Sequence, residues 1–179
     1  MVQKIVIIGP ESTGKSTLSE QLAAHYSAIY VKEYAREYLL THGTNYSYHN
    51  LLAIAKGQID MEEKALANIT TSINSHPKLI IDTDMYVMKV WCEFVFNNCH
   101  QFILNQIVQR KYHLYLLCNI DIPWVKDALR EYPDLITREK LYHHYKDILI
   151  NQQVPWVEIT GSYQQRLQLA IKTIDTLSI

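Results

Sequence analysis

Residues 5–16 read IVIIGPESTGKS, an apolar run that leads directly into a complete G-x-x-x-x-G-K-[ST] motif. A buried strand that feeds a glycine loop, with a helix beginning at the lysine, is the context in which this motif binds phosphate. Gly9 and Gly14 let backbone N–H groups converge on an anion without interference from a Cβ atom. The helix that we expect from Lys15 onward adds the positive end of its dipole. The stretch therefore predicts a nucleoside triphosphate site.

The motif also predicts the roles of its individual side chains. We expect Lys15 to reach the β- and γ-phosphates and the Ser16 hydroxyl to hold Mg²⁺. The residues of this loop that we expect to contact the nucleotide are Gly9, Glu11, Ser12, Thr13, Gly14, Lys15, Ser16 and Thr17.

The composition of the chain indicates the class of protein and excludes some binding partners. The chain has 179 residues, enough for one domain with a proper core, and its 48% apolar and 20% charged residues are typical of a soluble globular protein. The net charge of −1 provides no basic field that would attract nucleic acid. We therefore expect small-molecule partners and no nucleic-acid partner.

We expect a cytoplasmic location and no membrane partner. The first strand begins so early that it leaves no room for a signal peptide. No apolar run approaches the roughly 20 residues that cross a bilayer. The three cysteines, Cys92, Cys99 and Cys118, are odd in number and lack metal-binding spacing, which suits reduced thiols.

Apolar segments alternate with segments of helical periodicity along the whole chain. This order predicts an α/β fold of the P-loop NTPase kind, with a five-stranded parallel sheet and helices on both faces. The strands are expected at 5–8, 29–31, 79–81, 114–118 and 156–159. Helices are expected after the glycine loop, at 34–38, at 48–70, at 86–110 with a break near 97–98, and at 167–177. Residues 121–153 are expected to form a charged, mostly helical lid insert within a single domain of 1–179.

Ligands of parallel sheets collect at the carboxyl ends of the strands, and two aspartates lie at such an end. Asp82 occupies the Walker B position, where a carboxylate holds Mg²⁺ together with Ser16. Asp84 faces the same side if the strand continues, which makes it a candidate catalytic base and substrate ligand. The alternative is that Asp84 caps the helix that begins at Met85.

Glu33 and Arg36 come just after the second expected strand. Glu33 can accept the proton of an attacking hydroxyl or bind substrate hydroxyls. The two residues also fit a surface ion pair of little energetic weight. Gln58 lies on the inner face of the helix expected at 48–70, where a polar substrate and a solvated helix edge explain it almost equally well.

The insert at 121–153 contains Asp127, Arg130 and Arg138. A lid that closes over the phosphates and brings arginines to the transferring group is common in this chemistry. We favour that role for the two arginines over a solvated helix face. Trp91 and Trp124 are candidates for stacking on a base, although isolated aromatic residues more often pack in a core.

Five segments together resemble the nicotinamide riboside kinase domain, known best as the C-terminal domain of bifunctional regulators of NAD biosynthesis. The segment EYAREY at 33–38 and the segment IPWV at 122–125 are far more restrictive than the glycine loop. The resemblance implies a nucleoside-kinase-like fold with a lid. It also implies ATP-dependent phosphorylation of the ribose 5′-hydroxyl of nicotinamide riboside, which gives nicotinamide mononucleotide. The five segments are residues 9–17, 33–38, 82–84, 121–130 and 161–167.

The resemblance further implies roles for single residues. Glu33 and Arg36 would belong to the nucleoside pocket, and the loop at Gly161 and Ser162 would border the adenine of ATP. Arg130 and Arg138 would belong to the lid. The expected catalytic residues are Lys15, Asp84, Glu33, Arg130 and Arg138, with Asp84 and Glu33 both open as the base. The expected acceptor-binding residues are Glu33, Arg36, Gln58, Asp84, Trp91, Trp124 and Asp127.

The chain departs from this family in two ways. Ala128 stands where the family usually has a glycine, so the lid geometry is expected to differ slightly. The chain also lacks the adenylyltransferase and DNA-binding domains of the bifunctional proteins, from which we expect a stand-alone kinase.

Two other functions use the same phosphate loop. A kinase for another nucleoside or small metabolite would need the same frame. A regulatory nucleotide switch fits less well, because residues 119–121 read Asn-Ile-Asp and do not form the N-K-x-D motif that reads guanine in GTPases.

Overall fold

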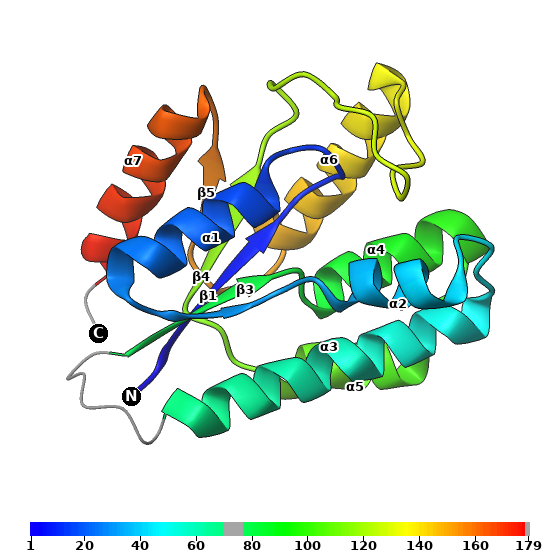
Figure 1. The fold of residues 1–179 in the computed structure, drawn as a ribbon, viewed down its shortest axis with the longest axis horizontal. Coiled ribbons are helices and arrows are strands. Elements are labelled where there is room, and N and C mark those ends of the chain that lie inside the picture. The colour runs from blue at the N-terminus through cyan, green and yellow to red at the C-terminus, as the bar shows by residue number, and fades with distance from the viewer. Residues whose placement is uncertain (70–76, 178–179) are drawn as a thin grey trace.

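The computed structural model describes residues 1–69 and 77–177, whose strands form a parallel sheet (Figure 1). In this part of the chain the sheet has five strands in the order β2-β3-β1-β4-β5, and every hydrogen-bonded pair is parallel. The α/β architecture expected from the apolar segments is therefore confirmed. The strands are β1 (Gln3–Ile8), β2 (Ile29–Val31), β3 (Lys78–Asp82), β4 (Leu114–Cys118) and β5 (Trp156–Ile159).

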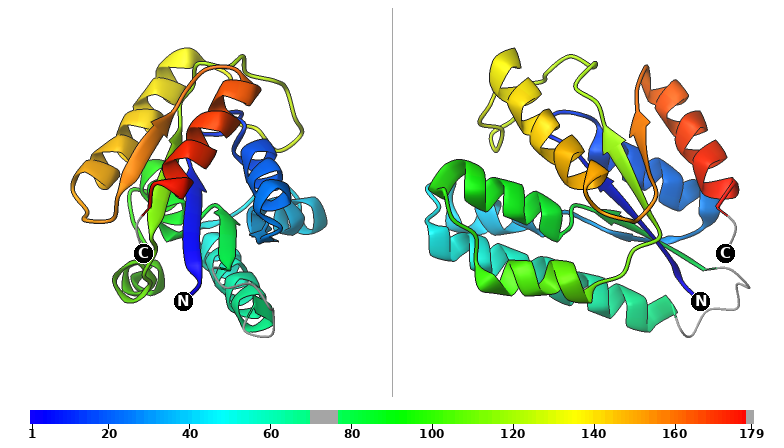
Figure 2. Two further views of the ribbon diagram at one scale, coloured as in Figure 1. Left: turned by 90° about the vertical axis from the view of Figure 1, so that its left-hand side faces the viewer. Right: turned by 180° about the vertical axis from the view of Figure 1, so that it is seen from behind.

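Helices cover both faces of this sheet (Figures 1 and 2). α1 and α7 pack on one face together with Ile5 and Ile7, whereas α4 and α6 pack on the other face with Val6 and Ile8. Successive side chains of a strand point to opposite faces, so residues 5–8 of β1 are all apolar and fully buried. The helices are α1 (Lys15–Tyr26), α2 (Tyr34–His42), α3 (Tyr48–Ile69), α4 (Met85–Phe96), α5 (Gln101–Gln109), α6 (Leu135–Ile150) and α7 (Tyr163–Asp175).

A helical group extends from one side of the sheet. In it α2, α3, α4 and α5 pack against one another around Ile54, Met88 and Ile103. Figure 2 shows these helices lying together, with α3 and α5 along the outside. The group matters for the site because α2 begins directly after β2 and α4 begins directly after β3. Their first turns therefore lie at the carboxyl ends of those strands.

Most of the expected helices are present. The helix expected at 48–70 is α3, which is described as far as Ile69, and residue 70 lies outside the described residues. The break expected near 97–98 falls at Asn97, whose φ of 51° ends α4. Within the described ranges, no helix is long and apolar enough to cross a membrane.

The lid insert differs from the prediction in its first half. Residues 121–134, which we call the strap, contain no helix, and α6 begins only at Leu135. Pro123 and Pro133 explain this, because proline lacks an N–H group and disfavours helical geometry in the residue before it. α6 itself is a core helix rather than a detachable lid, since Leu149 is fully buried against the sheet.

Candidate nucleotide and acceptor site

The phosphate loop, residues 9–14, connects β1 to α1 and requires glycine at both ends. Gly9 has a φ of 141°, and a Cβ atom there would lie 2.7 Å from the carbonyl oxygen of Cys118. Gly14 has a φ of 77°, and a Cβ atom there would lie 3.2 Å from the ring of Tyr163. A larger residue at either position would therefore distort the loop. Lys15 lies against the loop, with its Nζ donating to the carbonyl oxygen of Pro10 at 2.9 Å.

Arg166 on α7 fastens the phosphate loop to the ends of β4 and β5. Its Nη1 donates to the carbonyl oxygen of Thr13 at 3.0 Å, and its Nη2 donates to that of Asn119 at 3.0 Å. Its Nε donates to the carbonyl oxygen of Gly161 at 2.7 Å, and the guanidinium forms an ion pair with Asp121. The side chain is buried and its planar group is bound on several sides, so it links the loop to both strand ends.

Asp82 ends β3 beside the phosphate loop. Its Oδ2 accepts a hydrogen bond from Ser16 Oγ at 2.6 Å and one from the Tyr30 hydroxyl at 3.4 Å. Its Oδ1 is buried and has no hydrogen-bond partner among the described residues. Burial, with a contribution from the charge of Glu33, raises the pKa of the Asp82 carboxyl to about 6. A carboxylate oxygen without a partner beside a serine hydroxyl is a donor set that suits Mg²⁺, so these residues fit the expected metal.

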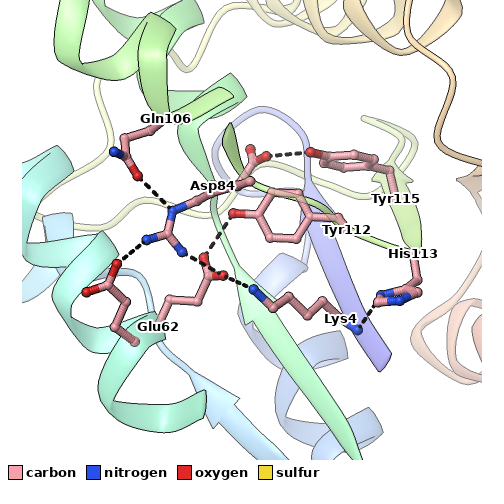
Figure 3. Close-up of polar contacts among 9 residues, drawn as sticks. Lys4, Glu62, Asp84, Gln106, Tyr112, His113 and Tyr115 are labelled. Atoms are coloured by element: carbon pink, nitrogen blue, oxygen red, sulfur yellow. Dashed lines mark hydrogen bonds and ion pairs between the residues drawn. The ribbon is translucent and has the colours of Figure 1, made fainter. Parts of the chain in front are cut away.

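Asp84 does not share the face of Asp82. Thr83 has a φ of 76°, so the strand ends at Asp82 and the chain turns. Asp84 Oδ1 accepts from the backbone N–H groups of Tyr86 at 3.0 Å and Val87 at 3.4 Å, which caps α4. Its Oδ2 accepts from the Tyr115 hydroxyl at 2.8 Å (Figure 3). The strand does not continue past Asp82, so the condition under which both aspartates would face one side is not met, and Asp84 caps α4 as in the alternative.

A cleft of about 800 Å³ opens beside the phosphate loop at the carboxyl ends of the strands. The Glu33 carboxylate lines it and, in the part of the chain that the structure describes, forms no hydrogen bond or ion pair. Asp84, by contrast, does not line the cleft. Burial raises the pKa of its carboxyl to about 7. The aromatic residues that line the cleft are Tyr30, Trp91, Phe94, Tyr132, Tyr145 and Tyr163. The polar residues that line it include Lys15, Ser16, Glu33, Arg36, Asp127 and Arg130.

The strap is held over this cleft from two sides. Arg36 on α2 forms a two-pronged ion pair with Asp127, at 3.2 Å between Nη1 and Oδ1 and 2.8 Å between Nη2 and Oδ2. This contact lowers the pKa of the Asp127 carboxyl. From the phosphate loop, Glu11 and Ser12 also accept hydrogen bonds from strap groups. The two expected acceptor-binding residues Arg36 and Asp127 thus meet each other at the cleft.

The two candidate stacking residues have different surroundings. Trp91 lines the cleft, and its Nε1 donates to the Tyr46 hydroxyl at 2.8 Å, which in turn donates to Glu131 at 2.9 Å. Trp124 does not line the cleft, and its Nε1 donates to Glu11 at 3.2 Å. The structure therefore leaves Trp91 beside the cleft and gives Trp124 a place in the strap.

Arg138 is a buried cation near the phosphate loop. Its side chain is only 4% exposed, and its Nε and Nη2 have no hydrogen-bond partner in the described ranges. Burial lowers the pKa of its guanidinium, and the charge of Glu11 partly opposes that change. An unpartnered guanidinium in this position is suited to an anion, although Arg138 itself does not line the open cleft.

Gln58 has structural partners instead of a place at the cleft. Its Oε1 accepts from the Tyr34 backbone N–H at 2.7 Å, and its Nε2 donates to the carbonyl oxygens of Lys32 at 3.2 Å and Asp82 at 3.4 Å. The residue is buried and does not line the cleft. It ties the ends of β2 and β3 together, so the structure gives no support to its expected contact with substrate.

The loop before α7 is likewise built on local contacts. Gly161 N–H donates to Asp121 Oδ2 at 2.6 Å, and Ser162 caps α7 in a reciprocal pair with Gln165. Neither Gly161 nor Ser162 lines the cleft, whereas the next residue, Tyr163, does. Tyr163 therefore lies closest to the expected nucleotide side of this loop.

Sequence reasoning did not select Arg166 or Tyr30 for the site. Arg166 carries a usable signal, because it has helical spacing with Ala170 and Ile174, and an arginine on that buried face needs an internal partner. Tyr30 carries none, since a tyrosine in a short strand fits ordinary packing.

The glycine loop after β1, the buried Asp82 at the end of the adjacent β3 and the cleft between them define the class: a P-loop protein with kinase-like architecture. The chain belongs to the AAA domain family, whose model matches residues 4–166.

Among curated proteins, the chain is similar to the trifunctional NAD biosynthesis/regulator protein NadR of Salmonella typhimurium and of Escherichia coli. Each is 26% identical over 165 residues, which cover 88% of this chain and 38% of NadR. The chain thus spans less than half the length of these relatives.

Among solved structures, the fold is similar to NadR in complex with NR, with a TM-score of 0.80 and 20% identity over 99% of this chain and 52% of that one. It is also similar to deoxyadenosine kinase from M. mycoides with bound dATP, with a TM-score of 0.63 and 14% identity over 97% of this chain and 100% of that one. Both likenesses show the fold alone.

Proposed function

We propose that this chain transfers the γ-phosphoryl group of ATP to the ribose 5′-hydroxyl of nicotinamide riboside and so forms nicotinamide mononucleotide. Similarity to NadR, including a NadR structure solved with NR, supports the acceptor. The observation in this chain that carries the proposal is the cleft of about 800 Å³, which joins the phosphate loop to an aromatic wall and to the unengaged carboxylate of Glu33.

The donor half is formed by the phosphate loop. Its backbone N–H groups and Lys15 bind the triphosphate, once Lys15 leaves the carbonyl oxygen of Pro10. Ser16 and Asp82 are the residues that would hold Mg²⁺. The metal supplies neutralisation of the charge that develops on the phosphate oxygens. Arg130 and Arg138 add positive charge for the transferring group.

The acceptor half is formed by α2, α4 and α6. Glu33 is the base in this proposal, because this residue lines the cleft, whereas Asp84 does not line it and both oxygens of Asp84 already accept hydrogen bonds. Trp91 and Tyr145, which both line the cleft, are the aromatic side chains that we assign to the pyridinium ring. The transfer then depends mainly on the alignment of the hydroxyl with the phosphoryl group and on charge neutralisation.

The test is product identification by mass spectrometry after incubation with Mg-ATP and separate ribosides. Nicotinamide riboside, adenosine, deoxyadenosine and thymidine form the panel, and the Lys15→Ala variant is the control. We expect nicotinamide mononucleotide as the main product and none from the variant. A deoxynucleotide as the main product would instead identify a deoxynucleoside kinase, which the likeness to deoxyadenosine kinase makes the second candidate. ADP formed without any phosphorylated riboside would contradict both.

A further inference from the structure

We infer that Glu11 is a positioning residue, whose carboxylate anchors the strap to the phosphate loop and so places Arg130 for phosphoryl transfer. This inference rests on the proposed function and gives Glu11 a role beyond the nucleotide contact expected from its place in the loop. A carboxylate within an anion-binding loop is electrostatically unfavourable once a triphosphate binds. Its presence in the loop therefore needs a role other than binding the nucleotide.

The contacts of Glu11 all lead to the strap. Its Oε2 accepts from the Glu131 backbone N–H at 2.9 Å, and its Oε1 accepts from the Tyr132 backbone N–H at 2.7 Å. The Trp124 Nε1 donates to the same Oε1 at 3.2 Å. Hydrogen bonds to an ionised acceptor are shorter and stronger than those between neutral groups. One side chain thus satisfies three donors from two separate parts of the strap.

The anchored groups flank Arg130 on both sides. Ser12, the next residue of the loop, accepts from the Val125 backbone N–H at 2.9 Å through its Oγ. Arg130 Nη1 donates to the Val125 carbonyl oxygen, so the arginine is folded back on the anchored segment. Because Arg130 lies between Val125 and Glu131, its position is set by contacts with the phosphate loop itself.

The buried Arg138 gives Glu11 a nearby counter-charge. Arg138 lacks a hydrogen-bond partner for its Nε and Nη2 in the described part of the chain, and Glu11 is the acidic group whose charge acts on it. The charge of Glu11 thus acts on Arg138 in the first turn of α6, while its two oxygens bind the backbone of the strap.

The direct test is amide hydrogen exchange in the nucleotide-free protein, measured by NMR at Glu131 and Tyr132. Glu11→Gln keeps the shape of the side chain but places an amide N–H group against the strap donors, and Glu11→Ala removes both acceptors. We expect exchange of the two amides to become faster by about tenfold or more in both variants. Glu139→Gln, which removes an exposed carboxylate of α6, is the matched control and should leave both rates unchanged. Unchanged rates in Glu11→Gln would overturn the inference.

Kinetics separate positioning from a general effect on the loop. We expect Glu11→Gln to lower kcat by about 10- to 100-fold, because an arginine displaced by about 1 Å loses much of its effect. The Kd for ADP should change less than about threefold, since backbone N–H groups bind the phosphates. Loss of ADP affinity as large as the loss of kcat would mean that Glu11 shapes the loop, and would overturn the inference.

The two proposals fail in different ways. If no riboside is phosphorylated by the unmodified protein, the proposed function is wrong. The exchange rates and the ADP affinity would still report on the anchor, because neither measurement needs an acceptor.

Discussion

At the scale of single residues, two aspartates that are two positions apart in the sequence have opposite surroundings. Asp82 has one oxygen held by Ser16 and one without a partner in the described ranges. Asp84 has both oxygens engaged by backbone N–H groups and by Tyr115. The position of Asp82 beside the phosphate loop could be predicted from its place at the end of an apolar strand. The role of Asp84 could not, because it depends on the positive φ of Thr83 and on a partner that is distant in sequence.

Asp82→Asn tests the metal-binding role of that residue. We expect kcat to fall by roughly 100-fold or more, since an amide holds Mg²⁺ less well than a carboxylate and the metal supplies several kcal/mol of charge stabilisation. Nucleotide affinity, measured by calorimetry with ADP, should change far less. Activity that stays within a few-fold of the unmodified protein would exclude Asp82 as a metal ligand.

Asp84 predicts a pH dependence of stability. Burial raises its pKa from 3.8 to about 7 in the folded protein, so between these values the native state holds a proton that the unfolded chain has lost. The contribution of protonated Asp84 to the free energy of unfolding is fully present at low pH and is lost as pH rises through the pKa that the group has in the folded protein. Relative to Asp84→Asn, which keeps the cap, the free energy of unfolding of the unmodified protein should therefore fall between about pH 4 and 7. Parallel urea-unfolding profiles for the two proteins would contradict this.

At the scale of elements, the insert at 121–153 consists of the irregular strap followed by α6, whereas periodicity alone predicts one mostly helical insert. The irregular strap could have been predicted from the prolines at 123 and 133, because proline interrupts a helix. The pairing of the strap with α2 was not visible, because Arg36 and Asp127 are separated by 91 positions. Periodicity reports local structure, whereas this contact depends on how the chain returns to the sheet.

Asp127→Ala tests the pairing of strap and α2. The Arg36 side chain is 54% exposed, so the lost ion pair should change the free energy of unfolding by less than about 1 kcal/mol. The KM for the acceptor should rise, by about three- to tenfold, because the strap is no longer aligned with α2. Asp60→Ala, which breaks an exposed pair with Lys64 on α3, is the control and should leave KM unchanged. An equal rise of the KM in both variants would contradict a role of the Arg36–Asp127 ion pair in acceptor binding.

At the scale of the whole molecule, the sheet could be predicted and its polar interior could not. Apolar runs identified the five strands of the described sheet, most clearly the central strands β3, β1 and β4, whose apolar residues are buried on both faces. Glu62 shows the limit: it is buried on α3 and its oxygens meet Lys4, Arg110 and Tyr112 (Figure 3). The sequence showed a carboxylate that needed partners. Those partners come from β1 and from the segment before β4, which only the fold brings together.

Arg166→Met tests how much the buried Arg166 side chain stabilises the fold by linking the phosphate loop to the ends of β4 and β5. The change leaves the carbonyl oxygens of Thr13, Asn119 and Gly161 without their donor, so we expect a loss of about 3–5 kcal/mol in the free energy of unfolding. Urea unfolding measures it, with Lys172→Met on the exposed side of α7 as the control. A loss below about 1 kcal/mol would show that the loop is held by other contacts.

The strap is fixed at both ends, and this limits how the cleft can open. Asp121 is bound to Arg166 at one end, and α6 is packed against the sheet at the other. Between these ends the strap is also bound by Arg36, Glu11 and Ser12, so it cannot swing on a hinge as a rigid cover does. We therefore expect any opening of the cleft on this side to require local loosening of these contacts. Insertion of a few residues into the strap should ease that opening without changing the floor of the site.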